Sequence, residues 1–189
     1  MAKAKKKAAQ RRSRPRSPAV QQDAIALLKS DHRQVEEWFE QFESTRSDDR
    51  KQRLAQQCCQ ALTVHTQIEE EIFYPAFLEA TEEEDIHHEA EVEHNGAKRL
   101  IAEIEASGPN DDYYDAKVKV LSEMIKHHVN EEEKRDGMFA KARKSDMDLE
   151  ALGERLAARK AELMEGAGAD DASSMARSRR SGTSSHVPH

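Results

Sequence analysis

The sequence predicts an all-α fold: an antiparallel up-down four-helix bundle with an extra C-terminal helix and disordered tails. Glycine and proline are scarce between residues 19 and 165. Apolar residues recur there at spacings of three and four, which is the period of a helix, and no segment shows the strict alternation of a half-buried strand. Four long periodic segments joined by short turns indicate antiparallel neighbours in one bundle.

The length of 189 residues suits one domain with tails. Residues 1–18 contain eight basic side chains and no acid, and residues 166–189 contain three arginines and two aspartates among Gly, Ala and Ser. Such segments have little to bury, and both tails are expected to be disordered. The segment 19–165 contains 19 basic and 35 acidic side chains, so the folded part is acidic and would repel polyanions.

The composition excludes several classes of protein. The longest apolar run, residues 72–78, is interrupted by Pro75 and is far shorter than the roughly 18 to 20 residues that span a bilayer. The basic N-terminus is followed by no apolar stretch, unlike a secretory signal peptide. Cys58 and Cys59 are adjacent and form neither a disulfide framework nor a CxxC motif; we expect one to face the core and the other a flank. These features predict a cytoplasmic protein without membrane segments.

The first two helices each carry one histidine in an apolar stripe. The first is expected over about residues 19–44, and its buried face consists of Ile25, Leu28, His32, Val35, Phe39 and Phe42. The second is expected from the capping residues Ser47 and Asp48 to about residue 78. Its buried face consists of Leu54, Cys58, Ala61, His65, Ile68 or Glu69, and Ile72.

The next two helices repeat this pattern. The third is expected to open at Thr81, which stands three residues before Glu84 as in a capping box. Its buried face consists of His87, Ala90, His94, Ala97, Ile101 and Ile104. The fourth, from about residues 110–112, places on one face Val118, Leu121, Ile125, His128, Glu132 and Phe139.

A shorter fifth helix completes the predicted organisation. Ser145 is expected to cap it, and it spans residues 145–165 after a bundle domain over residues 19–144. Its apolar face consists of Leu149, Leu152, Leu156 and Leu163. We expect this face to pack on the bundle or on a partner.

A histidine on the buried face of each of four helices costs desolvation unless something inside the bundle binds it. Two of these histidines stand in His-x-x-x-Glu segments, and residues four apart on a helix project from the same face, so that each pair can hold one metal ion. Carboxylates from facing helices can bridge two ions about 3.5 to 4 Å apart. The predicted metal ligands are four histidines and two glutamates: His32, His65, Glu69, His94, His128 and Glu132.

The histidine doublet of the fourth helix leaves an alternative open. His127 stands four residues before Glu131, just as His128 stands four residues before Glu132. The apolar stripe of that helix favours the second pair. His127 with Glu132 is a further combination, at a spacing of five.

The segments HTQIEEEIFYP, EVEHNGAKRLI and HHVNEEEKRDGMF resemble the hemerythrin-like, HHE cation-binding family over about residues 20–144. The resemblance implies a non-heme di-iron centre held by the six predicted ligands, with Mn or Zn able to occupy the same nitrogen and oxygen donors. It also implies a protein that binds or senses a small ligand such as dioxygen, nitric oxide or peroxide. The alternatives are a di-iron enzyme that consumes peroxide or nitric oxide, and a metal-responsive regulatory or interaction protein.

The sequence departs from the oxygen-carrying branch of that family, which places a second histidine one turn from the first on the third helix. Here the corresponding positions are Ala90 and Lys98. The change leaves an open position or a water, or recruits a carboxylate such as Glu91, and it favours chemistry or sensing over carriage. His87 could be a ligand or an outer partner of a ligand, and the favoured interpretation is a surface residue.

Some residues are expected to act outside the metal centre. Four glutamates are expected to face outward or to orient the ligand imidazoles: Glu70, Glu71, Glu131 and Glu133. Residues 1–18 are expected to be solvated or to contact nucleic acid non-specifically, because they contain clustered Lys and Arg but no recognised reading motif. The sequence does not indicate an oligomeric state.

Overall fold

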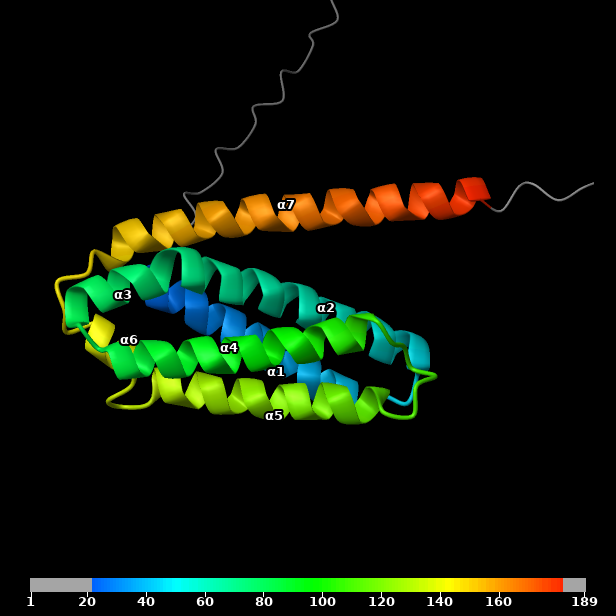
Figure 1. Cartoon of the computed structure of the whole chain (residues 1–189), viewed down its shortest axis with the longest axis horizontal. Helices are drawn as coiled ribbons and strands as arrows, with labels where there is room; N and C mark the ends of the chain where they lie inside the picture. Colours follow the sequence, from blue (N-terminus) through cyan, green and yellow to red (C-terminus); the bar gives the residue numbers. More distant parts are fainter. Residues whose placement is uncertain (1–21, 182–189) are drawn as a thin grey trace, which may run out of the picture.

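The computed structural model describes residues 22–181, and four long antiparallel helices form its body (Figure 1). They are α1 (Ala24–Ser44), α2 (Asp48–Ile68), α4 (Glu84–Glu105) and α5 (Tyr114–Glu133). Helix α1 packs against α2 and α5, and α4 packs against the same two helices. This closed ring of neighbours confirms the predicted up-down bundle, and residues 22–181 contain no strand. None of the helices in this range combines the length and apolarity needed to cross a membrane.

Capping side chains fix where the first two helices begin. Asp23 Oδ1 accepts a hydrogen bond from the backbone N–H of Ala26 at 2.7 Å, so α1 begins at Ala24 and not near residue 19. The Ser47 hydroxyl accepts from the N–H of Arg50, which confirms the predicted start of α2. Both caps satisfy a backbone donor that the first turn of a helix leaves free.

The predicted capping box at Thr81 is wrong. Thr81 is the last residue of α3, and its hydroxyl donates to the carbonyl of Phe77 at 2.7 Å. Glu82 follows in the left-handed region with a φ of 56° and ends that helix. Helix α4 therefore begins only at Glu84, with Glu83 as its N-cap residue.

Helix α5 is shorter at both ends than the sequence predicts. A turn in which Tyr113 N–H donates to Asp111 Oδ1 at 2.8 Å delays its start to Tyr114. Its last helical residue is Glu133, and Phe139 lies in the separate α6 (Met138–Ala142). Gly137 permits the reversal between them, because a Cβ at that position would lie 2.2 Å from the carbonyl oxygen of Glu131.

The last helix, α7 (Leu149–Ser181), begins after a different cap from the predicted Ser145. Asp148 Oδ1 accepts from the N–H of Ala151 at 3.0 Å. The helix continues beyond the predicted end at residue 165, because each added residue contributes one backbone hydrogen bond once a helix exists. The rest of the predicted tails, residues 1–18 and 182–189, lies outside the described residues.

The predicted second helix is interrupted by a π-helical turn, η1 (Glu69–Phe73), which leads into α3 (Tyr74–Thr81). Pro75 lies two residues after the end of η1. A proline has no N–H to donate and its ring clashes with the carbonyl four residues earlier, and the wider π-helical turn relieves both problems. The N–H of Tyr74 bonds to the carbonyl of Glu69, five residues back. This register places Glu69 and Tyr74 on one face, where a regular α-helix would separate them by about 140°.

Two apolar clusters fill the bundle on either side of a polar layer. This layer consists of the buried side chains of His32, His65, Glu69, His94, His128 and Glu132. One cluster extends toward the α1–α2 and α4–α5 turns and includes Phe39, Leu62 and Ile125. The other includes Phe73, Phe77 and Leu156, the last contributed by α7. The polar layer between them is consequently shielded from solvent at both ends of the bundle.

Helix α7 packs along α1, α2 and η1 (Figure 1). Leu152 and Leu156 are buried under it, as the sequence predicts for its apolar stripe. Two basic residues of α7 also reach the bundle: Arg159 pairs with Glu71 at 2.7 Å and Lys160 with Asp31. The extra helix therefore contacts the polar layer as well as the core.

Cys58 and Cys59 are both buried, at 0% and 1% exposure, so the expectation that one faces a flank is wrong. Burial raises the pKa of each thiol to about 12. The reactive thiolate is then roughly one part in 10⁴ at pH 8. We expect neither thiol to be alkylated by iodoacetamide at pH 8 in the folded protein and both to be alkylated in urea, as measured by mass spectrometry. Rapid alkylation of the folded protein would contradict this account of the core.

Candidate metal centre

The six predicted ligands meet in the polar layer, and each is at most 4% exposed. The Nε2 atoms of His32 on α1 and His65 on α2 lie 3.1 Å apart. The Nε2 atoms of His94 on α4 and His128 on α5 lie 3.2 Å apart. The bundle thus brings the four histidines together as two pairs whose Nε2 atoms face each other.

The two glutamates lie between the histidine pairs. Glu69 Oε2 is 3.3 Å from His65 Nε2 and 3.4 Å from His94 Nε2. Glu132 Oε2 is 3.4 Å from His32 Nε2 and 3.7 Å from His128 Nε2. Each carboxylate therefore reaches one imidazole of each pair, which is the placement that a bridging ligand requires.

Two groups of three residues have ligand atoms close enough to surround a single ion. The first consists of His32, His65 and Glu69, and the second of Glu69, His94 and His128; within each, the ligand atoms lie within 4.8 Å of one another. Metal–ligand bonds to nitrogen and oxygen are about 2.0 to 2.2 Å long, so donors of one ion lie up to about 4.4 Å apart, which a shift of a few tenths of an ångström in these side chains would reach. Glu69 belongs to both groups, so two ions held there would share it.

The unsatisfied atoms of this layer fit a bound cation. Both oxygens of Glu69 and Oε2 of Glu132 are buried without a hydrogen-bond partner among the described residues. Unpartnered buried carboxylate oxygens are costly. The four histidines present their Nδ1 atoms to carboxylates, so in a neutral ring the facing Nε2 atom has a lone pair that is free to bind a cation. The residues present therefore fit a metal centre.

Burial and neighbouring charges shift the pKa values of this layer in opposite directions. Burial lowers the pKa of His32 to about 4. Burial also opposes protonation of His65, but attraction to Glu69 and the hydrogen bond to Asp31 outweigh it and raise that pKa to about 10. Burial and repulsion from Glu69 raise the pKa of Glu132 to about 7. Such divergent shifts are typical of functional sites.

A ring of outer carboxylates orients the four imidazoles. The Nδ1 atoms pair as follows: His32 with Glu133 at 2.9 Å, His65 with Asp31 at 3.5 Å, His94 with Glu70 at 3.0 Å, and His128 with Glu93 at 2.7 Å. Each acid stands next in sequence to a predicted ligand on one helix and reaches the histidine of a neighbouring helix. A carboxylate on the remote nitrogen fixes the tautomer and makes the imidazole a stronger metal ligand.

The sequence predicts part of this ring correctly. Glu70 and Glu133 contact ligand histidines as expected, whereas Glu71 pairs with Arg159 and Glu131 with Lys134. Asp31 and Glu93 were missed, although each directly precedes a predicted ligand histidine in the sequence. Their position next to a ligand is the signal that could have identified them. Successive side chains are about 100° apart around a helix, so the neighbour of an inward-facing residue faces the adjacent helix.

The structure separates the alternatives on α5. His128 and Glu132 face the polar layer, whereas the His127 side chain is 60% exposed and pairs with Glu93 at 3.2 Å. His87 and Glu91, whose closest atoms are 3.8 Å apart, belong to neither of the two candidate groups. His128 and Glu132, the pair that the sequence favours on the fourth helix, are therefore the pair that is buried in the bundle.

Tyr74 is a site residue that the sequence did not reveal. Its side chain is fully buried, and its hydroxyl lies 3.1 Å from His94 Nε2 and donates to Glu132 Oε1 at 3.2 Å. Burial and the nearby carboxylates raise its pKa well above the usual range. Regular helix spacing would point Tyr74 away from Glu69, so only the π-helical register brings it to the site.

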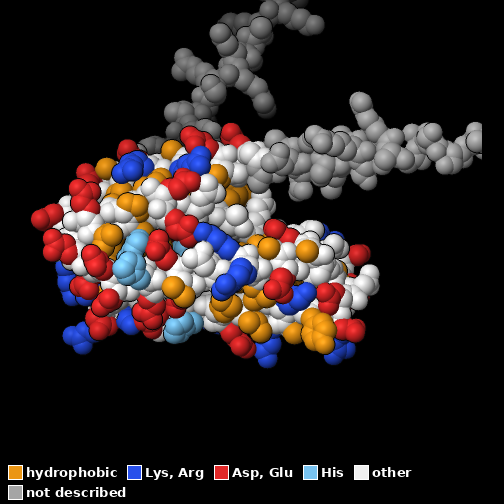
Figure 2. All heavy atoms as spheres, viewed as in Figure 1, with side chains coloured by type: hydrophobic (Ala, Val, Ile, Leu, Met, Phe, Trp, Pro, Cys, Tyr) orange, Lys and Arg blue, Asp and Glu red, His pale blue; other side chains and the backbone are white. Residues whose placement is uncertain are grey.

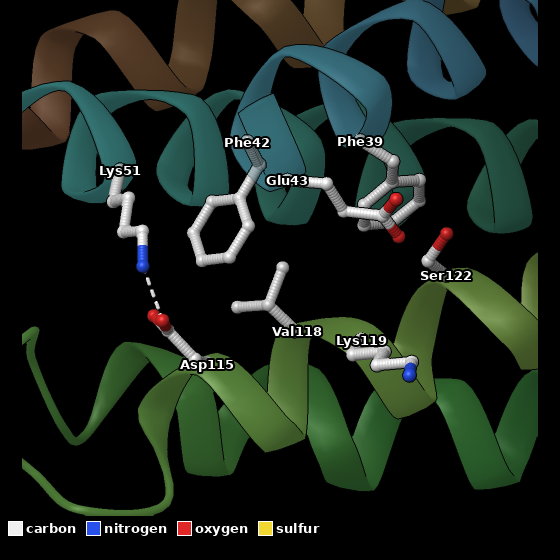
Figure 3. Close-up of a pocket in the computed structure, with 8 residues that line it drawn as sticks. All are labelled: Phe39, Phe42, Glu43, Lys51, Asp115, Val118, Lys119 and Ser122. Atoms are coloured by element: carbon white, nitrogen blue, oxygen red, sulfur yellow. Dashed lines mark hydrogen bonds and ion pairs between the residues drawn. The ribbon is translucent and has the colours of Figure 1, made fainter. Parts of the chain in front are cut away.

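Three pockets of the described structure differ in how close they lie to the predicted metal ligands. The largest, of about 280 Å³, is lined by Phe39, Phe42, Val118 and Ser122 between α1 and α5, beside the Lys51–Asp115 pair (Figure 3). It contacts none of the predicted ligands. A narrow apolar cavity of about 10 Å³ touches all four ligand histidines. A third hollow, of about 50 Å³, opens between α4 and α5 and touches His128 and Glu132.

Removing one outer carboxylate should weaken metal binding without removing a ligand. Glu93→Gln keeps the size of the side chain but replaces the charged partner of His128 Nδ1. Loss of such a partner typically costs about 10- to 100-fold in metal affinity. We expect a weakening of that size for one of two ions, measured by competition with a chromophoric chelator. The same exchange at Glu103, which is exposed on α4, serves as the control, and equal affinities in the two variants would contradict the role of Glu93.

Comparisons with known proteins give the same picture of the bundle. The sequence matches the family of the hemerythrin HHE cation binding domain over residues 23–142. The crystal structure of a hemerythrin HHE cation binding domain-containing protein from Mycobacterium kansasii is similar, with a TM-score of 0.64 and 25% identity, covering 77% of this chain and 89% of that one. A DNA nickase from Nostoc sp. is 28% identical over 107 residues, which are 57% of this chain but only 30% of the nickase.

Proposed function

The chain belongs to the hemerythrin HHE cation-binding family, and from this premise we propose that it binds two iron ions and uses them to bind or sense a small ligand such as dioxygen, nitric oxide or peroxide. The observation that supports this best is that His32 with His65, and His94 with His128, lie around buried oxygens of Glu69 and Glu132 that have no hydrogen-bond partner among the described residues. The family and the histidine and glutamate groups establish a metal-binding protein; iron, its ligand and the assignment of ligand residues are the proposal.

In this proposal each histidine pair holds one ion. His32 and His65 would hold the first and His94 and His128 the second, with Glu69 and Glu132 as ligands within reach of both. When bound, the ions would supply the redox chemistry and the affinity for a small molecule. Mn or Zn suits the same nitrogen and oxygen donors, so the choice of iron is a matter of availability as well as affinity.

The surroundings of the second group of ligands, Glu69, His94 and His128, support reaction with a small molecule or sensing of it rather than reversible carriage of dioxygen. The oxygen-carrying branch has a second histidine one turn from the first, and the corresponding positions here are Ala90 and Lys98. Ala90 lines the hollow beside His128 and Glu132. The Tyr74 hydroxyl lies on the same side of the centre, next to His94. By turning its hydroxyl from Glu132 Oε1 toward a bound molecule, Tyr74 would hydrogen-bond to a small polar ligand, and consumption of peroxide is therefore the second candidate function.

A basic tail adds a candidate partner. Residues 1–18 contain eight Lys and Arg. In addition, part of a protein named a DNA nickase is similar in sequence to this chain. We propose non-specific, salt-sensitive contact of this tail with nucleic acid. Deleting residues 1–18 should abolish retention on DNA at low salt, and unchanged retention would refute the proposal. The bundle itself carries abundant surface acid (Figure 2).

The proposed function is tested by measuring metal content and optical absorption on one purified sample. We expect close to two irons per chain with a near-ultraviolet charge-transfer band, and a spectral change on adding nitric oxide or peroxide. Peroxide consumption that is lost in His65→Ala and His128→Ala would indicate an enzyme, whereas a reversible spectral change without turnover would indicate a binding or sensing protein. Folded protein that refuses ferrous iron under anaerobic conditions would refute the proposal.

A further inference from the structure

The hollow of about 50 Å³ between α4 and α5 is lined both by residues of the surface and by two of the predicted ligands. Its inner end is formed by Ala90, His128 and Glu132, which are at most 4% exposed. Its mouth is formed by Glu89, which is exposed, and by Glu131 and Lys134, whose side chains are 28% and 43% exposed. The exposure of the lining thus falls from solvent to the ligands along one short hollow.

The lining of this hollow suits a cation. Glutamates contribute at its mouth and at its inner end, and the single basic side chain there, Lys134, is paired with Glu131. At the inner end Glu132 has a buried oxygen without a hydrogen-bond partner. Figure 2 shows acidic side chains crowded at the end of the bundle where α4 begins and α5 ends. A charged ion that leaves water needs replacement oxygens of this kind.

The apolar cavity on the other side of the ligands is a poorer route for an ion. Its lining consists of Val35, Leu62, Ile125 and Val129 together with the four histidines, Thr66 and Asp31, and its volume is only about 10 Å³. A cavity of this volume holds about one water molecule. It does not admit an ion that still carries several waters, whereas the hollow of about 50 Å³ admits an ion that exchanges most of its waters for carboxylate oxygens.

We infer that the hollow between α4 and α5 is the route by which divalent metal ions reach the centre. Glu89 and Glu131 attract the ion at the mouth, the small side chain of Ala90 leaves space for it, and Glu132 receives it. Lys134 restrains uptake, because its charge offsets that of Glu131. This inference rests on the proposed function, since it assumes that the centre binds metal.

The test is the rate at which metal-free protein takes up ferrous iron under anaerobic conditions. Samples are quenched with a chromophoric ferrous chelator at intervals and desalted, and protein-bound iron is measured. Charged clefts typically raise association rates by 10-fold or more. We therefore expect the double variant Glu89→Gln, Glu131→Gln to load about 10-fold more slowly at low salt, with the difference shrinking at high salt as the charges are screened.

Two further variants and one control make the result specific. Lys134→Gln should load faster than wild type, because it leaves the charge of Glu131 unopposed. Ala90→Val narrows the inner end without changing charge, and it should load more slowly at every salt concentration. Glu103→Gln makes the same charge change at an exposed position elsewhere on α4 and should load at the wild-type rate.

The outcomes separate this inference from the proposed function. Wild-type protein that takes up no iron refutes both. Wild-type protein that binds two irons while all variants load at its rate refutes the route alone. A lower final iron content in the Glu89, Glu131 double variant also refutes the route, because these residues would then be part of the binding site. Slower loading to an unchanged final content of two irons supports it.

Discussion

Replacement of Glu69 by alanine is expected to abolish binding of both metal ions. Glu69 Oε2 lies within 3.4 Å of a histidine from each pair, and the residue belongs to both candidate groups. Its removal takes one ligand from both groups at once and leaves each pair of histidines with Glu132 as the remaining shared carboxylate. We expect metal content after anaerobic reconstitution to fall from two irons per chain to near zero, measured by elemental analysis of the folded, desalted protein.

Two comparison variants make this loss interpretable. His65→Ala removes one donor of the first group only, so we expect one ion to be retained on Glu69, His94 and His128. Glu71→Ala truncates a glutamate of the same π-helical turn that pairs with Arg159 and touches no predicted ligand, and it should retain both ions. Two ions bound by the Glu69→Ala protein would show that this carboxylate is not the bridge.

The ligand set was accessible from the sequence because it depends on helical period alone. Residues four apart share a face of a helix, so the His-x-x-x-Glu segments, one at the junction of α2 and η1 and one on α5, are each predicted to face inward as a pair. The single histidines of α1 and α4 follow from their place in apolar stripes. The structure brings all six side chains into one buried layer; their role as ligands remains to be tested by metal binding.

The rest of the site depends on places where the chain departs from the regular α-helical period. Tyr74 reaches the centre only because the π-helical turn inserts one residue ahead of Pro75. Helix ends were also missed where competing hydrogen bonds decide them, as at Thr81, which bonds backward to Phe77. Phe139 is buried as predicted, but on α6 after a reversal at Gly137 that no periodic pattern reveals.

The outer carboxylates link the metal centre to the architecture. Each joins the ligand histidine of one helix to a neighbouring element, and three of the four are held in turn by a basic side chain: Asp31 by Lys160, Glu70 by Lys98, and Glu133 by Lys29 and Arg33. Asp31 extends this chain to α7, which lies outside the matched family segment. A change at the centre is therefore able to reach the extra helix through two ion pairs.

Removal of the metal is expected to lower the melting temperature by at least about 10 °C. An ion at 1,000 times its dissociation constant stabilises the folded state by about 4 kcal/mol, and 1 kcal/mol corresponds to about 2 to 4 °C for a chain of this size. The loss is large because the metal-free layer retains unpartnered carboxylate oxygens and facing imidazoles between all four helices. Thermal unfolding followed by circular dichroism, with and without chelator, measures it.

The Glu69→Ala protein supplies the control, because it should no longer bind either ion. Its melting temperature should be the same with and without chelator, which separates metal removal from any direct effect of the chelator on the helices. Restoring ferrous iron should raise the melting temperature of the wild type alone. If chelation leaves the wild type unchanged although its two irons have been removed, the buried histidines and glutamates are stable without a cation, and a bundle whose folding responds to metal is excluded.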